Sequence, residues 1–327
     1  MNGATVDEAA SMLLSPTKAP QIAISAIAST CVMFLFGGIV ERWLIAVLRP
    51  SAGELTWIGD VILATGFGVV FYLWLHLRAA REALHEAERA QIVMNTQFEI
   101  AANIQRSLLP SPPASRRGVS WAVQLTPAYR IGGDYYDFVD LDGAGRVFII
   151  GDISGKGVPA AMMLAYVRAV FRLAVRETRE PPEIVARLAE AIHADTGGNP
   201  YMTCIVGRVD EAARRLSVTN AGHPGGVMIG NGTRRIGSHG PPAGLLPQLE
   251  YEQDAIDVRA GDRAIFVTDG ISERLTVDLP RAFAELPPRG TASQLCASVV
   301  RLAEGPRGVI PVEGWDDDRT VLVLAVD

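Results

Sequence analysis

The sequence is poor in the residues on which several common kinds of site depend. Its 327 residues include only three cysteines, Cys31, Cys204 and Cys296, which lie far apart and form no Cys-x-x-Cys pair. This scarcity excludes a disulfide framework and predicts reduced, buried thiols in a protein that faces the cytosol. The five histidines show no zinc-like spacing, which argues against a histidine-based metal site.

A strong charge bias, a P-loop and internal repeats are also missing. The net charge is only −6, and no basic stripe with interleaved aromatic residues occurs, so we expect no nucleic-acid partner. The glycine-rich stretch 151–157 lacks both the four-residue spacer and the Ser or Thr of a P-loop. That phosphate-binding motif is therefore excluded.

Charged residues are almost absent from residues 21–40 and 57–77, where only Asp60 interrupts the second run. A helix of twenty residues is about 30 Å long, which matches the hydrocarbon core of a bilayer. We therefore predict a transmembrane hairpin at 21–77 after a loose tail at 1–20. A signal peptide is disfavoured because no basic region and no small-residue cleavage site flank the first run. The basic flanking residues favour a two-pass protein of the inner or plasma membrane with both termini and the C-terminal domain in the cytoplasm.

Residues 78–109 contain neither proline nor glycine, and Pro110 ends this stretch. Their apolar and small residues follow a strict 3-4 spacing that continues from the second span, which predicts a coiled-coil linker helix at 78–110 and a parallel homodimer through 78–109. The alternative is an amphipathic helix packed on its own domain. The predicted seam consists of Leu77, Ala80, Leu84, Ala87, Gln91, Met94, Phe98, Ala101, Gln105 and Leu108.

The pattern changes after Arg117, and residues 111–327 form the predicted C-terminal domain. Short strand-like runs come in consecutive groups with helices between the groups, which predicts an α/β (α+β) sandwich of two mainly antiparallel sheets flanked by helices. The expected strands are 119–125, 146–150, 203–209, 215–219, 226–229, 264–267 and 320–326. The expected helices are 158–175, 182–194 and 292–302.

Four acidic residues of this domain share one context, a carboxylate at a strand end or in a glycine-rich turn. They are Asp134, Asp152, Asp269 and Asp317. Asp152 is expected just beyond the buried strand 148–150, where a rigid support would present it to solvent. Oxygen ligands without histidine suit Mg²⁺ or Mn²⁺. Taken one at a time, each aspartate is also explained as a turn or cap residue.

The order of the motifs GGDYYDF, GDISGKGVPAA, NAGHPGG, FVTDGISE and DDRT resembles the SpoIIE/RsbU type of bacterial phosphatases, within the metal-dependent type 2C family. The resemblance covers about residues 107–327. It implies two β-sheets flanked by helices, with two Mn²⁺ or Mg²⁺ ions at one edge of the sandwich. By motif position, Asp152 would bridge both ions with the backbone carbonyl of Ile153 as a further ligand, and Asp134, Asp269 and Asp317 would complete the set.

The same resemblance implies further roles and leaves several open. Asp317 is preferred over Asp316 and Asp318 because Thr320 fixes the register of the motif. Asp137 would support the ligands from behind. Arg130, four residues before Asp134, is a candidate phosphate ligand, and the alternative is an ordinary solvated arginine. His223 would either contact phosphate or brace its turn.

Two departures from the family pattern bear on the chemistry. Ser154 stands where the eukaryotic branch has a histidine, which leaves the general acid open, and metal-bound water is a candidate. The segment 274–290 is shorter than the family's flap and rich in proline.

The resemblance implies hydrolysis of phosphoserine or phosphothreonine on a cytosolic regulatory protein, with a small anti-sigma-factor antagonist as the first expectation. A phosphatase-like scaffold that signals by binding alone is the main alternative. A diguanylate cyclase is disfavoured because Tyr135 replaces the acidic residue of its GGD[E/D]F loop and the later motifs are unexplained.

Overall fold

The computed structural model describes residues 37–43, 56–128, 131–155, 157–230, 232–247, 249–287, 290–304 and 317–327. The chain divides into two compact units, Met1–Val93 and Met94–Asp327. The predicted tail and most of the first predicted span lie outside the described residues. The second unit begins inside the linker helix, earlier than the boundary near residue 110 expected from the sequence.

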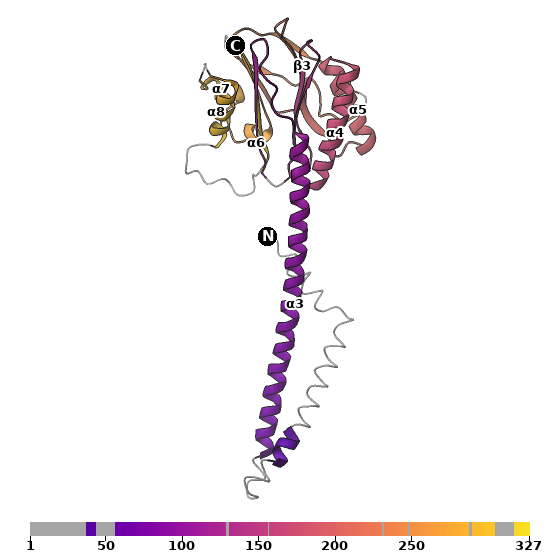
Figure 1. Ribbon diagram of the computed structural model, residues 1–327, viewed down its shortest axis with the longest axis vertical. Coiled ribbons are helices and arrows are strands. Elements are labelled where there is room, and N and C mark those ends of the chain that lie inside the picture. The colour runs from indigo at the N-terminus through magenta and orange to yellow at the C-terminus, as the bar shows by residue number, and fades with distance from the viewer. Residues whose placement is uncertain are drawn as a thin grey trace. The chain divides into compact units, whose positions relative to one another are not determined.

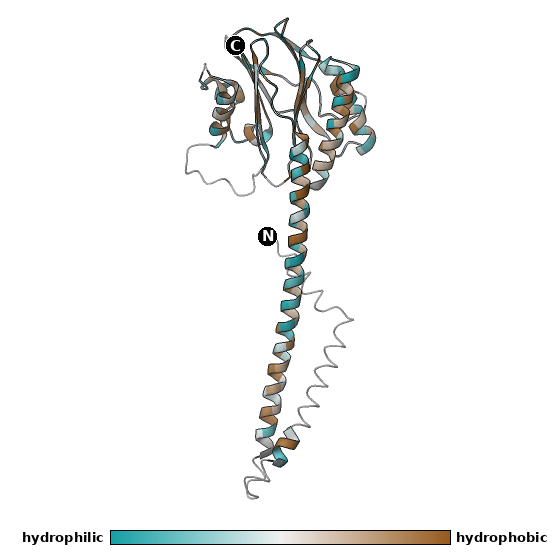
Figure 2. Cartoon of the chain, in the orientation of Figure 1, coloured by the Kyte–Doolittle hydropathy of each residue, from teal (hydrophilic) through white to brown (hydrophobic). Residues whose placement is uncertain are grey.

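Helix α3, Thr56–Leu108, is one uninterrupted element of 53 residues. Figure 2 shows that brown, hydrophobic residues gather in its N-terminal part and teal ones further along. Within the described part of the chain, α3 is the one helix whose length and composition would suffice to cross a membrane. The second predicted span, 57–77, therefore lies within a helix, as expected. The first span and the two-pass arrangement stay predictions.

The domain is built from two five-stranded antiparallel sheets, which lie face to face in Figure 1. One sheet has the order β1-β10-β9-β6-β7 and the other β2-β3-β4-β5-β8. The strands of the first are Val119–Thr126, Arg319–Val326, Arg263–Val267, Gly225–Gly230 and Gly232–Ile236. Those of the second are Asp134–Asp140, Arg146–Ile153, Met202–Asp210, Arg215–Ala221 and Asp254–Asp257.

Helices cover the outer face of each sheet. Helices α4 (Val158–Glu177) and α5 (Pro181–Thr196) pack on β2, β3, β4 and β5. Helices α7 (Leu279–Ala284) and α8 (Ala292–Glu304) pack on the other sheet, and the short α6 (Asp269–Ser272) follows β9. This helix–sheet–sheet–helix order confirms the predicted sandwich.

Three apolar cores separate these layers, because alternate residues of a strand point to opposite faces. On β3, Phe148 and Ile150 point between the sheets, where they join Trp121 and Phe266. Val147, Ile149 and Ile153 point instead toward α4 and α5. The third core lies between the first sheet and α7 and α8. The same alternation decides which polar residues reach the space between the sheets.

The structure adds elements that the sequence did not predict and corrects one boundary. Strands β2, β7 and β8 and helices α6 and α7 are additional. Strand β3 extends through Ile153, so Asp152 lies within the strand and not beyond its end. Helix α7 occupies part of the shortened segment 274–290, where Leu279 and Phe283 are buried against the sheet.

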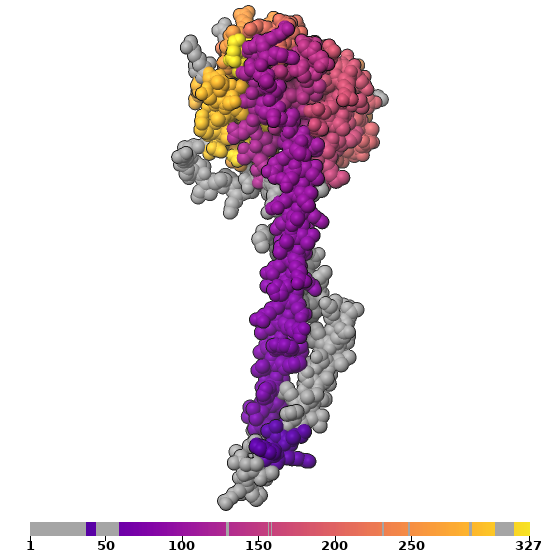
Figure 3. Space-filling model, in the orientation of Figure 1, coloured from indigo at the N-terminus to yellow at the C-terminus, as the bar shows by residue number. Residues whose placement is uncertain are grey.

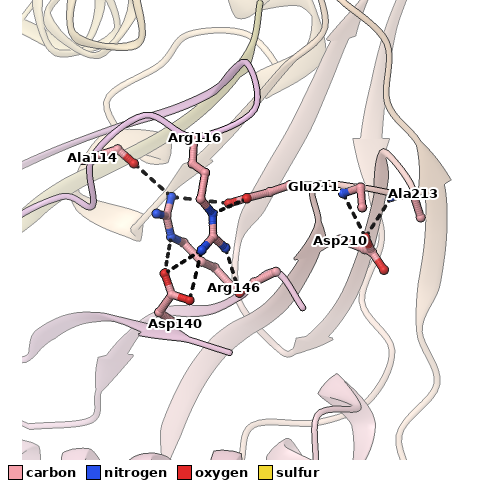
Figure 4. A network of polar contacts seen from close by, with 9 residues as sticks. Ala114, Arg116, Asp140, Arg146, Asp210, Glu211 and Ala213 are labelled. Atoms are coloured by element: carbon pink, nitrogen blue, oxygen red, sulfur yellow. Dashed lines mark hydrogen bonds and ion pairs between the residues drawn. The ribbon is translucent and has the colours of Figure 1, made fainter. Parts of the chain in front are cut away.

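A polar network ties the segment between α3 and β1 to the ends of β2, β3 and β4 (Figure 4). Arg116 donates to Glu211 at 2.5 Å and to Asp140 at 3.3 Å. Arg146 donates to Asp140 and to the carbonyl of Ala114. The side chains of Arg146 and Glu211 are only 7% and 3% exposed, so this network fixes the segment at a buried point.

Candidate metal centre

Asp134 and Asp152 are direct neighbours across the β2–β3 ladder. By strand alternation both side chains point between the sheets, on the face of Phe138 and Phe148. Like charges directly opposite each other in a sheet are destabilising. A pair of this kind calls for a compensating positive charge or for protonation.

Residues of the opposite sheet hold one oxygen of Asp134. Its Oδ2 accepts hydrogen bonds from Thr320 Oγ1 at 2.6 Å and from Thr268 Oγ1 at 2.9 Å. Thr320 also donates its amide to Thr268 Oγ1 at 2.9 Å. The other oxygen of Asp134, Oδ1, is buried and has no hydrogen-bond partner. One edge of this carboxylate is therefore fixed, and the other is available to a ligand.

Asp269 and Asp317 reach the same edge of the sandwich from the first sheet. Asp269 begins α6 directly after β9, and Asp317 lies just before β10. Strands β9 and β10 are antiparallel neighbours, with Val267 opposite Val321, so the end of one adjoins the start of the other. All four aspartates singled out in the sequence thus lie at one edge.

Asp318 has a different task from its neighbour Asp317. Its Oδ2 accepts from the amide of Gly133 at 2.7 Å, and its Oδ1 accepts from the amide of Ala128 at 2.8 Å. The carboxylate therefore holds the Gly132–Gly133 turn. Choosing Asp317 as the ligand is consistent with this geometry, and the role of Asp318 in the turn was missed.

The Gly132–Gly133 turn needs glycine because other groups approach it closely. A Cβ atom on Gly133 would lie 2.5 Å from Asp152 Oδ1 and 2.8 Å from the carbonyl oxygen of Ile153. A Cβ atom on Gly132 would collide with the carboxylate of Asp318. Because both residues of the turn are glycines, the Asp152 carboxylate and the Ile153 carbonyl can lie close against its backbone.

Burial and mutual repulsion raise the pKa values of these carboxyl groups. Burial, followed by the charges of Asp269, Asp317 and Asp318, raises the pKa of Asp152 to about 8. Burial and the charge of Asp152 hold the pKa of Asp134 well above its usual range. Burial and the charge of Asp317 raise the pKa of Asp269. These three carboxyl groups therefore hold protons more strongly than usual, and a cation that binds to them would displace those protons.

The residues present fit a hard divalent cation. The donors are carboxylate oxygens and one carbonyl, which Mg²⁺ and Mn²⁺ prefer. An unpartnered buried Asp134 Oδ1 and the close approach of Asp152 and Ile153 to Gly133 point to the same conclusion. Among the described residues, no three His, Cys, Asp or Glu side chains form a closed ligand set. The carboxylates are gathered within electrostatic reach of one another without completing a coordination sphere.

We expect the metal-free protein to become less stable as the pH rises from about 4 to about 8. In this window the folded protein keeps protons on carboxyl groups such as Asp152, whereas the unfolded chain releases them, so ΔG of unfolding falls with pH. Thermal unfolding of the full chain in detergent with EDTA, at pH 5, 6, 7 and 8, measures this. A melting temperature that rises steadily over the series would contradict the assignment.

The sequence predicted that Asp137 would support the metal ligands, but Asp137 lies on the opposite face of β2 and contacts α4. Its fully buried carboxylate accepts two hydrogen bonds from Arg172 of α4, both at 2.8 Å. Tyr135 Oη and the amide of Phe138 also donate to it. Asp134 and Asp137 are three positions apart on β2, and because successive side chains of a strand alternate, they point to opposite faces. Asp137 therefore fastens α4 to β2.

Of the two predicted phosphate ligands, the structure describes only His223, and it is buried. His223 is 4% exposed, its Nδ1 lies 3.1 Å from Thr203 Oγ1, and its backbone is held by Asn220. This burial favours the bracing role among the two left open. Burial also lowers the pKa of His223 to about 3, so the ring is neutral. Arg130 lies outside the described residues.

Ser154, which replaces the histidine of the eukaryotic branch, is bound to the backbone of Tyr201. Its Oγ accepts from the amide of Tyr201 at 2.9 Å, and its own amide donates to the carbonyl of Tyr201. The hydroxyl is thus used to fix the loop that leads into α4.

The last turns of α3 pack against this domain, in purple in Figure 3. Gln105 is 8% exposed and Ala102 is 5% exposed, and Leu108 packs on the core beneath α4 and α5. For this part of the helix, the alternative of packing on the same chain is correct, and the predicted coiled-coil seam does not extend to Gln105.

A family model described as Stage II sporulation protein E (SpoIIE) matches residues 142–327. The phosphoserine phosphatase RsbU of Bacillus subtilis is 22% identical over 298 residues, which cover 87% of this chain and 84% of RsbU. The phosphoserine phosphatase RsbP of the same organism is 26% identical over 195 residues. That match covers 56% of this chain and 47% of RsbP, so the chain spans about half of that relative.

Solved structures show the same fold. The SiaA-PP2C domain of Pseudomonas aeruginosa superimposes with a TM-score of 0.61 at 21% identity, covering 73% of this chain and 99% of that domain. The PP2C phosphatase domain of SpoIIE from Bacillus subtilis, with a fragment of its regulatory domain, gives 0.54 at 19% identity over 65% of this chain and 64% of that one. RsbX, solved in complex with magnesium, gives 0.52 at 14% identity, covering 65% of this chain and 98% of RsbX.

Proposed function

This chain belongs to the SpoIIE family, and on that premise we propose that it is a metal-dependent protein serine/threonine phosphatase. The observation that carries the proposal is the pairing of Asp134 with Asp152 across β2 and β3, beside Asp269 and Asp317. Two divalent ions, Mn²⁺ or Mg²⁺, would be held by these four carboxylates and the carbonyl of Ile153. When bound, such ions activate water for in-line attack on phosphorus.

The chain's own residues would then orient and protect the centre. Thr268 and Thr320 keep Asp134 in one orientation through its Oδ2. Asp318 fixes the Gly132–Gly133 turn against Asp152. The neutral, buried His223 braces Thr203, which lies opposite Asp152 on β4. These contacts hold the carboxylates in place before substrate arrives, which reduces the reorganisation needed for reaction.

A phosphatase assay tests the proposal directly. The full chain in detergent should release phosphate from a phosphoserine peptide when MnCl₂ is present, and the release should stop with EDTA and return with added Mn²⁺. The same assay separates the alternatives. Release of phosphate without any metal requirement would refute the metal mechanism, and no release under any condition would favour a scaffold that acts by binding.

We propose the cytosolic regulatory phosphoprotein as substrate, with a small anti-sigma-factor antagonist as the first candidate. The relatives RsbU and RsbP are described as phosphoserine phosphatases, which supports the class of reaction. Capture of phosphoproteins by a metal-ligand variant, followed by dephosphorylation with the wild-type chain, would identify the substrate. Failure of every captured protein to lose phosphate would exclude this class.

We also propose that the chain is anchored by two membrane spans with both termini in the cytoplasm. In a variant with Cys31 replaced by serine, Cys204 and Cys296 are both buried, so added cysteines report their own accessibility. Ser51→Cys should react with an impermeant thiol reagent on intact cells, and Ser115→Cys only after lysis. The reverse pattern would invert the proposed topology.

A parallel homodimer through residues 78–109 is the proposed assembly. Leu84 and Met94, two members of the predicted seam on α3, are 58% and 53% exposed, which is compatible with packing against a second copy, whereas the turns near Gln105 are already packed. Disulfide formation between copies of a Leu84→Cys variant, at a seam position, would support the parallel arrangement. Light scattering that gives a monomer at micromolar concentration in detergent would refute it.

A further inference from the structure

The connection between β7 and β8 contains a short loop, residues 244–247, that exposes apolar side chains. Leu245 and Leu246 are 36% and 48% exposed, and Pro247 beside them is also exposed. The described part of residues 111–327 exposes five large apolar side chains, and two of them are neighbours in this loop. A single exposed leucine is ordinary on a protein surface, whereas three adjacent apolar residues form a candidate contact surface. We call residues 244–247 the leucine loop.

The backbone of the leucine loop is held in place, so the exposure does not come from a loose segment. Ala243 donates its amide to the carbonyl of Met202 at 2.7 Å and accepts from the amide of Met202 at 2.9 Å. His193 Nδ1 of α5 donates to the carbonyl of Gly244 at 3.0 Å. A Cβ atom on Gly244 would lie 2.2 Å from Ile192 Cγ2. The loop therefore presents its leucines on a fixed support.

The same contacts place the leucine loop close to the candidate metal centre. Met202 is the first residue of β4 and pairs with Ile153 of β3, while Ala243 forms a bridge to Met202 from the other side. Neighbouring strands lie about 4.8 Å apart, so Ala243 is about 10 Å from Ile153 across the sheet. Leu246 comes three residues later and therefore lies within about 20 Å of the Ile153 carbonyl.

This position favours the phosphoprotein substrate as the molecule that covers the loop. A phosphoserine that reaches Asp152 and Ile153 brings its flanking residues along this edge of the sandwich. An extended segment advances about 3.3 Å per residue, so about six residues span 20 Å. Two leucines and a proline expose far less surface than the about 800 Å² that each partner buries in a stable interface. A transient enzyme–substrate contact fits that small area better than a second copy of the chain does.

We propose that the leucine loop is a docking surface for the protein substrate, which it binds through apolar residues about four to six positions from the phosphoserine. This inference rests on the proposed phosphatase function. The metal centre would act on any phosphoserine that reaches it, whereas the loop would favour phosphoserines with apolar flanking residues. Discrimination between substrates would then appear in kcat/KM.

Two synthetic phosphoserine peptides test the inference on the full chain in detergent with MnCl₂. They are identical except at the fourth to sixth positions on both sides of the phosphoserine, which are leucine in one peptide and serine in the other. The leucine peptide should show a kcat/KM about tenfold higher, mainly through a lower KM, which corresponds to about 1.4 kcal/mol. The double variant Leu245→Ser, Leu246→Ser should lose this preference and hydrolyse the serine peptide as the wild type does.

Leu173→Ser is the matched control, because Leu173 is 57% exposed and lies fifteen residues into α4, about 22 Å from the start of that helix. It should keep the tenfold preference. Leu246→Ser alone should reduce the preference, and it decides the question if the double variant does not fold. A preference that survives in the folded variant, or an equal loss for both peptides, would overturn the inference. A change in the mass of the full chain by light scattering would also overturn it, since the loop would then join two copies.

Failure of the inference and failure of the proposed function give different results. Equal hydrolysis of the two peptides by the wild type would refute docking at the loop and leave the phosphatase function supported. If neither peptide releases phosphate, the proposed function fails, and fluorescence anisotropy of the labelled peptides then tests docking by itself. Tighter binding of the leucine peptide that is lost in the double variant would support docking, and equal binding of the two peptides would refute it.

Discussion

Asp152→Asn should reduce Mn²⁺-dependent phosphate release by at least about a hundredfold, because losing a shared metal ligand usually costs orders of magnitude in rate. The same change should raise the melting temperature of the metal-free protein. Burial and the neighbouring acidic charges raise the pKa of Asp152 to about 8, which means that they disfavour its ionised form in the folded protein. Asparagine carries no charge at this position and removes that cost. Steady-state phosphate release and thermal unfolding in EDTA provide the two measurements.

Asp142→Asn is the matched control for this substitution. Asp142 lies in the turn between β2 and β3, on the same hairpin as Asp152, and is exposed. It should leave activity and melting temperature unchanged. Retention of more than about a tenth of the activity in Asp152→Asn would contradict the proposed ligand role.

Arg172→Met should destabilise the domain by about 3 kcal/mol, because it leaves the carboxylate of Asp137 buried without its main ionic partner. The Asp137 side chain is 0% exposed, and the next arginine, Arg168, is 3.8 Å away, which is too far for a full replacement. A loss of this size corresponds to a fall in melting temperature of about 6–12 °C for a domain of this length. Thermal unfolding of the full chain in detergent measures it.

Two further variants separate the buried ion pair from a general effect of removing arginine. Arg187→Met breaks the pair with Glu177, in which the side chains are 49% and 47% exposed, and should cost at most about 1 kcal/mol. Adding Asp137→Asn to Arg172→Met should recover part of the loss, since the unpaired buried charge is then gone. Equal destabilisation by Arg172→Met and Arg187→Met would show that the contact with Asp137 contributes little.

The sequence predicted the sandwich and the position of its acidic residues because both depend on local patterns. Strand β3 contains the apolar run 147–150, and Asp152 and Asp269 each lie two residues after the last residue of an apolar run. Strand β2 was missed because Gly-Gly-Asp-Tyr-Tyr-Asp has the composition of a turn. The buried Asp137, which faces α4, is compatible with a strand only through Arg172, whose position 35 residues away gives no local signal.

The predictions for the edge strands and for the end of α3 were wrong for related reasons. Strand β7, with Arg234 and Arg235, is mostly exposed, so it lacks the apolar alternation that identifies a strand. Gln105 occupied a regular position of the predicted coiled-coil seam, and periodicity alone does not say which surface a helix face will contact. The polar residue at that position was the available signal, since it fits a backbone partner better than an apolar seam.

The position of β10 in its sheet has a consequence for synthesis of the chain on the ribosome. This strand, Arg319–Val326, lies between β1 and β9, so β1 has no partner within its sheet until about two hundred further residues have been made. The sheet that carries Asp134 and Asp152 is different, because its strands β2 to β5 pair as successive neighbours. It can form early in the nascent chain, whereas pairing between distant segments is slow. Asp317 and Thr320 arrive last, so the metal centre is completed only after the rest of the domain has been translated.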